Sequence, residues 1–125
     1  LARPVTLRAL IGDRLTLFSG EDMTMAGFNA SGGQGVISVL SNIIPKESAE
    51  IQRLTIAGDY KKANQLHARY VPLIHALFAE TNPIPVKYAL SLMGKCGPDY
   101  RLPLVAPSDA VKTQMRDALT ALKLI

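Results

Sequence analysis

The sequence of 125 residues contains no tryptophan and a single cysteine, Cys96. One cysteine excludes an internal disulfide and fits a reducing compartment, so a cytoplasmic protein is expected. No cation cluster near Cys96 in the sequence would lower the pKa of its thiol, so an unreactive thiol is expected. No stretch approaches the roughly 18 apolar residues of a membrane-spanning helix, and no membrane association is expected.

The charge balance is basic, with a formal net charge of +4 and an isoelectric point near 9.4. Such a balance invites a nucleic-acid interpretation. However, the cations are spread along the chain with acids among them, and aromatic residues make up only 6% of the sequence. Because no aromatic residues interleave with the cations as stacking platforms, no nucleic-acid partner is expected.

Two short apolar runs predict strands, at Leu15–Ser19 and Val36–Leu40. The segment between them, Asp22–Ala30, has a helix-compatible composition with Asp22 as a plausible N-cap, and Gly32 and Gly33 suit a helix C-terminus. So short a crossover predicts a parallel, right-handed strand–helix–strand unit. In such units chemistry collects beyond the carboxyl ends of the strands, here residues 20–22 and 41–42.

The rest of the chain predicts helices. One opens the sequence with Pro4 in its first turn, and another runs from Pro45 to Gly58. A long helix over residues 59–80, kinked at Pro72, is followed by helices that begin near Asn82 and at Ser108 or Pro107. We therefore expect two parts: residues 1–57 with alternating strands and helices, and residues 58–125 as a three-helix subdomain.

Several residues could carry chemistry, but each also has a structural interpretation. Glu21 and Asp22 could act as paired carboxylates at a strand end, although a helix cap with a first-turn acid is favoured. His67 and His75 are eight residues apart, too far for a helical metal pair, so no metal is expected. Lys87 follows two prolines near a helix start, where most lysines cap or pair. Finally, the glycine cluster at residues 32–35 precedes a strand, the reverse of a phosphate-binding loop.

Four motifs occur in one order along the chain: Leu17-Phe18-Ser19-Gly20-Glu21-Asp22, Gly32-Gly33-Gln34-Gly35-Val36-Ile37-Ser38-Val39, Asn82-Pro83-Ile84-Pro85-Val86-Lys87 and Arg101-Leu102-Pro103-Leu104. Together they resemble the C-terminal half of the dihydrodipicolinate synthase (4-hydroxy-tetrahydrodipicolinate synthase) family, over residues 15–124. The resemblance implies an α/β fold: the last part of a (β/α)8 TIM barrel followed by a helical subdomain. A whole barrel needs roughly 200 residues or more, so we expect this chain to be a piece of one.

The resemblance also implies an activity. Members of the family are lyases that condense pyruvate, held as an iminium on a lysine, with aspartate semialdehyde in lysine biosynthesis. They need no cofactor and assemble as homotetramers. The positions that contact pyruvate correspond to Gly20 and Ile37 here, whereas the iminium-forming lysine lies on a strand before the helix that opens this chain. We therefore expect no catalytic residue in these 125 residues, and no activity from them alone.

Two alternatives stay open. Another pyruvate-dependent aldolase, such as N-acetylneuraminate lyase, would share the barrel and the lysine chemistry, although the motif at residues 82–87 argues against it. A noncatalytic half-barrel or helical interaction module is the alternative from a different class.

Overall fold

The protein is described by a computed structural model that covers residues 2–125. The chain divides into two compact units, with the division between Arg69 and Tyr70. The sequence pattern placed a boundary after residue 57. The difference arises because the helix that follows residue 57 packs against the helix before it and thus lies within the first unit.

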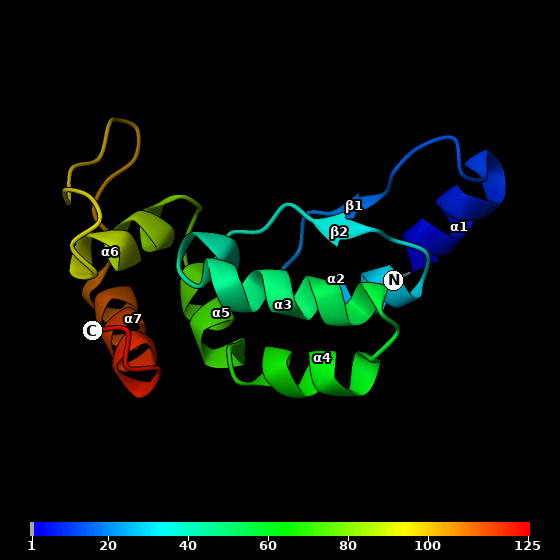
Figure 1. The fold of residues 1–125 in the computed structure, drawn as a ribbon. Coiled ribbons are helices and arrows are strands. Elements are labelled where there is room, and N and C mark those ends of the chain that lie inside the picture. The colour runs from blue at the N-terminus through cyan, green and yellow to red at the C-terminus, as the bar shows by residue number, and fades with distance from the viewer. Residues whose placement is uncertain (1) are drawn as a thin grey trace. The chain divides into compact units, whose positions relative to one another are not determined.

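The first unit begins with helix α1 (Ala2–Ile11), strand β1 (Phe18–Ser19), helix α2 (Met25–Ala30) and strand β2 (Gly35–Val36). The two strands are parallel neighbours (Figure 1), which confirms the predicted strand–helix–strand unit. The strands are shorter than predicted. Val39 and Leu40 in particular were expected in the second strand, but Leu40 instead begins the 3-10 helix η1 (Leu40–Asn42), which Val39 caps. The backbone N–H groups of both residues donate to the Asp22 carboxylate, so the two residues do not continue the strand.

Helix α2 ends as the glycines predict. The Gly32 N–H donates to the carbonyl of Asn29 at 3.1 Å, and the Gly33 N–H donates to that of Phe28 at 3.0 Å. This pair of bonds is the Schellman motif, which needs a residue in the left-handed region, and Gly32 has φ of +97°. Glycine reaches that region without a Cβ clash, so the chain reverses at once and enters β2.

Arg8 fastens α1 to the segment between α2 and β2. Its guanidinium donates to the carbonyl of Gly32 at 2.7 Å and to Oε1 of Gln34 at 3.3 Å. The same Gln34 oxygen accepts the N–H of Leu17 at 3.2 Å. One arginine therefore links the first helix to the entrances of both strands.

The first unit is completed by helices α3 (Pro45–Ile56) and α4 (Tyr60–Ala68), which run in opposite directions (Figure 1). They pack on each other and on α2. The predicted start at Pro45 and end at Gly58 are confirmed. Asp59 then caps α4, because its carboxylate accepts the N–H of Lys62 at 3.1 Å. Met25, Leu40 and Ile51, each fully buried, form the centre of this core.

The second unit contains α5 (Val71–Leu77), α6 (Ile84–Leu92) and α7 (Asp109–Ala121). The single long helix predicted over residues 59–80 is wrong: α4 ends at Ala68, and α5 begins at Val71. Pro72 is the reason, because it lacks the N–H that would bond back to the preceding turn and so is tolerated only in a first turn, where it lies in α5.

Helices α5, α6 and α7 pack on one another, and the large side chains with at most 1% exposure in this core include Leu73, Ile74, Leu77, Met115 and Leu119. Ser108 caps α7 as predicted, accepting the N–H of Val111 at 3.4 Å. Asn82 does not cap α6, because Pro83 occupies the N-cap position and no side chain bonds there.

Candidate functional site

Gly20 and Ile37 lie side by side at the ends of the two strands. Phe18 is paired with Gly35 and Ser19 with Val36, and the Ile37 N–H continues this pairing by donating to the Ser19 carbonyl at 2.8 Å. The next residues in register are therefore Gly20 and Ile37. Gly20 and Ile37, which belong to separate motifs of the sequence, are thus neighbours across the two strands.

The pair faces the open side of the strands. Leu17 and Ser19 are buried, whereas Phe18 is 55% exposed and Ile37 is 71% exposed. Since side chains alternate along a strand, Gly20 shares the open face with Phe18. A Cβ added at Gly20 would meet nothing within 4 Å. A small ligand on this face could approach the Gly20 backbone while resting against the Ile37 side chain.

Asp22 is not the cap of α2. Thr24 occupies that N-cap, and no side chain bonds there. Asp22 is instead 1% exposed, and its Oδ2 accepts the N–H groups of Val39 at 2.8 Å and Leu40 at 3.0 Å. The favoured prediction of a cap was thus right about the chemistry of Asp22 but wrong about the helix, because the carboxylate caps the turn after β2.

Glu21 makes only local contacts. Its side chain accepts the Met23 N–H at 2.9 Å, and its own N–H donates to the Ser19 hydroxyl at 3.0 Å. Glu21 is exposed and Asp22 is buried. The two side chains therefore have separate partners, which favours structural roles for both.

His67 supports Asp22 from α4, a role that the sequence analysis missed. The imidazole is 6% exposed. Burial lowers the pKa of His67, while a hydrogen bond to the Asp22 backbone and the negative Asp22 carboxylate oppose that shift. One sequence signal could have indicated burial: His67 follows the buried Ala63 by four residues, the spacing of one helix face.

The remaining candidates do not assemble a reactive centre. His67 belongs to α4 and His75 to α5, and residues 2–125 hold no group of three or more His, Cys, Asp or Glu side chains suited to a metal. The Lys87 ammonium lies 5.5 Å from the centre of the Tyr100 ring, a cation–π distance. The Cys96 sulfur lies 3.7 Å from the Lys87 carbonyl oxygen. No helix within residues 2–125 is both long and apolar enough to cross a membrane.

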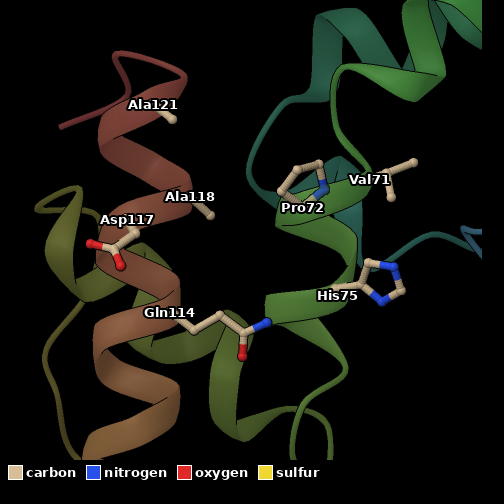
Figure 2. A pocket seen from close by; sticks show the side chains of 7 residues that line it. All are labelled: Val71, Pro72, His75, Gln114, Asp117, Ala118 and Ala121. Atoms are coloured by element: carbon tan, nitrogen blue, oxygen red, sulfur yellow. The ribbon is translucent and has the colours of Figure 1, made fainter.

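Each unit also contains a cavity. One of about 520 Å³ lies between α5 and α7, where Gln114 extends from α7 toward α5 (Figure 2). Another of about 380 Å³ lies beside Asn29, Gln34 and Tyr60 in the first unit. Gln34 precedes β2, so this second cavity is at the opposite end of the strand from Ile37.

The chain is similar in sequence to a known family over almost its whole length. Residues 1–122 match the family model described as the Dihydrodipicolinate synthetase family. A 4-hydroxy-tetrahydrodipicolinate synthase of Methylobacterium radiotolerans is 49% identical over 112 residues, which are 90% of this chain and 38% of the relative. The enzyme of the same name from Acidiphilium cryptum is 46% identical over 125 residues, covering 100% of this chain and 43% of the relative.

Solved structures agree with these sequence relatives. The dihydrodipicolinate synthase of Aquifex aeolicus superposes with a TM-score of 0.96 at 35% identity, over 98% of this chain and 42% of that one. The chloride-inhibited enzyme of Acinetobacter baumannii complexed with pyruvate gives 0.94 at 35% identity, over 99% and 43%. The expected fold class, a part of a (β/α)8 barrel followed by helices, is confirmed. The chain spans about two fifths of the length of the relatives it matches.

Proposed function

The chain belongs to the dihydrodipicolinate synthetase family, and we propose that it forms the C-terminal part of a 4-hydroxy-tetrahydrodipicolinate synthase. The intact enzyme would condense pyruvate with aspartate semialdehyde in lysine biosynthesis. The observation that carries the proposal is the Gly20–Ile37 pair, adjacent in register at the carboxyl ends of parallel strands and open on one face. Barrel enzymes bind their substrates at that end of the strands.

The two residues have different tasks in this proposal. Gly20 leaves its backbone accessible, because a side chain there would occupy the volume of a three-carbon ligand. Ile37 supplies an apolar wall that keeps water from the reacting carbon. The lysine that forms the iminium, the tyrosines that move protons and the threonines that bind the pyruvate carboxylate would all come from outside these 125 residues.

The helical part has a second role in the proposal. We expect the second unit, α5 to α7, to help organise a homotetramer of the intact enzyme. One related structure, 40% identical in sequence, is that of the first monomeric dihydrodipicolinate synthase variant. Sedimentation of the full-length protein tests the expectation, and a monomer that is fully active would contradict it.

A substrate comparison on the full-length protein tests the proposed reaction. We expect turnover when pyruvate is supplied with aspartate semialdehyde, and none when N-acetylneuraminate is supplied instead. Cleavage of N-acetylneuraminate with no condensation of aspartate semialdehyde would assign the protein to the other aldolase branch. No reaction with either, together with no borohydride-trapped pyruvate adduct, would favour a noncatalytic module.

A further inference from the structure

The Asp22 carboxylate joins the two segments that follow β1 and β2. Its Oδ2 accepts the Val39 N–H at 2.8 Å and the Leu40 N–H at 3.0 Å. Asp22 comes two residues after Gly20, and Val39 comes two residues after Ile37. The bridge therefore fastens the two strand ends to each other directly beyond the residues proposed to line the ligand.

The bridge is enclosed, and this limits its movement. Asp22 is 1% exposed, and both backbone N–H groups lie within 3.0 Å of its Oδ2. Ser38 and Ser41 hold the same turn from within: the Ser41 N–H donates to the Ser38 hydroxyl at 2.8 Å, and the Ser41 hydroxyl donates to the Ser38 carbonyl at 3.0 Å. The turn after Ile37 thus has little freedom to move away from β1.

Helix α4 packs against the bridge through His67. His67 of α4 is buried, and the backbone and carboxylate of Asp22 both raise the pKa of its imidazole against the effect of burial. Among residues 2–125, neither Oδ1 of Asp22 nor Nε2 of His67 has a hydrogen-bond partner, although both atoms are buried. Asp22 is therefore committed to the bridge by one oxygen alone, and that oxygen carries both bonds.

We propose that Asp22 is a positioning residue of the ligand site, whose carboxylate sets the separation between the Gly20 backbone and the Ile37 side chain. It touches neither ligand nor reacting atoms, and it acts through the two strand ends that it joins. The inference rests on the proposed function, since the Gly20–Ile37 pair is the ligand wall only there. Removing the carboxylate would let that wall move, and small displacements of positioning groups are costly for catalysis.

The test uses the full-length protein that contains this chain. Asp22→Ala removes both hydrogen bonds, whereas Asp22→Asn keeps an oxygen that can accept from both amides. We expect Asp22→Ala to lower kcat/KM for pyruvate by about tenfold or more, mainly through a higher KM. We expect Asp22→Asn to recover kcat/KM to within about threefold of the parent.

Asn29→Ala is the matched control. Asn29 is 8% exposed, and its Nδ2 donates to Gln52 and Thr55, each at 2.8 Å, away from the strand ends. The control should lower Tm and leave kcat/KM within about twofold of the parent. If Asp22→Ala likewise lowers Tm but keeps kcat/KM within about twofold, Asp22 has only a structural role and the inference is overturned.

A second readout separates this inference from the proposed function. Amide exchange of Val39 and Leu40 should be faster by about tenfold or more in Asp22→Ala than in Asn29→Ala. A parent protein that turns over no pyruvate overturns the proposed function, and the exchange rates alone then decide whether Asp22 holds the strand ends. Unchanged exchange at both amides would overturn the inference whatever the parent does.

Discussion

Phe18 and Gly35 are direct partners across the two strands, and the Phe18 ring occupies the space that a side chain on Gly35 would need. A Cβ built on Gly35 would lie 2.7 Å from Cε1 of Phe18 and 2.9 Å from its Cδ1. The ring shares its face with the Gly20–Ile37 pair, two residues further along the strands. The glycine that begins the second strand is therefore a packing requirement of the open face.

We expect Gly35→Ala in the full-length protein to lower the free energy of unfolding by about 1–3 kcal/mol, because the added methyl must displace the Phe18 ring. Chemical denaturation measures the loss. The double variant Gly35→Ala/Phe18→Leu should regain part of it, since leucine lacks the clashing ring. If Gly35→Ala alone matches the parent in stability, the ring does not constrain this position.

Gly20→Val should damage the site rather than the fold. In this chain a Cβ at Gly20 meets open space and Gly20 has no positive φ, so no backbone strain opposes the change. On the open face, however, the valine side chain would enter the volume proposed for pyruvate. We expect kcat/KM for pyruvate to fall by about a hundredfold, corresponding to roughly 3 kcal/mol of transition-state stabilisation. Steady-state kinetics with varied pyruvate would contradict the proposed lining if the value stays within about twofold of the parent.

The control for Gly20→Val is Gly33→Ala, which should do the opposite. A Cβ at Gly33 would collide with Cδ1 of Phe28 and lie 2.8 Å from its backbone oxygen, so the end of α2 must shift. Thermal melting should show a lower Tm by several degrees, because a backbone atom cannot swing aside as a side chain can. The kcat/KM of the protein that remains folded should be close to that of the parent.

His67 should make stability depend on pH. Burial lowers the pKa of folded His67 from its ordinary value of 6.5, so just below that pH the unfolded chain binds a proton that the folded chain does not. The free energy of unfolding therefore falls as pH drops through about 6.5 and levels off below the folded pKa. Melting curves of the full-length protein at about pH 7.5 and about pH 5.5 should show a larger fall in Tm for the parent than for His67→Asn. Equal falls in the two proteins would mean that His67 is not the group responsible.

The 125-residue chain by itself should form no pyruvate adduct. No lysine lies on β1 or β2, the two strands that the structure describes. Hydrogen-bonded carboxylates of Asp59 and Asp109 raise the pKa values of Lys62 and Lys112, which keeps both amines protonated and poorly nucleophilic. Incubation with pyruvate and borohydride, followed by mass spectrometry, checks this. A stoichiometric adduct on any one lysine would contradict it.

Local signals predicted the local structure well. The glycines at 32 and 58 ended their helices, and Ser108 capped α7. Such features depend on a few neighbouring residues, and the sequence displays them directly.

The errors arose where distant residues decide the outcome. Asp22 is a good cap by type, but its amide partners lie 17 and 18 residues away, and only the folded chain brings them near. The apolar period through Leu66, Tyr70 and Leu73 stays in phase across the break between α4 and α5, so periodicity could not reveal that break. His67 reaches Asp22 through tertiary packing alone, and no local pattern encodes that contact.

Asp59 performs two tasks at one position: its N–H donates to the Leu54 carbonyl at 2.9 Å at the end of α3, and its carboxylate caps α4. The connection therefore has no spare residue. An insertion between Gly58 and Asp59 would separate the two caps, and one within α4 ahead of His67 would rotate His67 by about 100° away from Asp22. Chain length is thus fixed from Gly58 to His67. Relatives that keep His67 next to Asp22 must place their insertions and deletions elsewhere, for instance in the connection between α6 and α7.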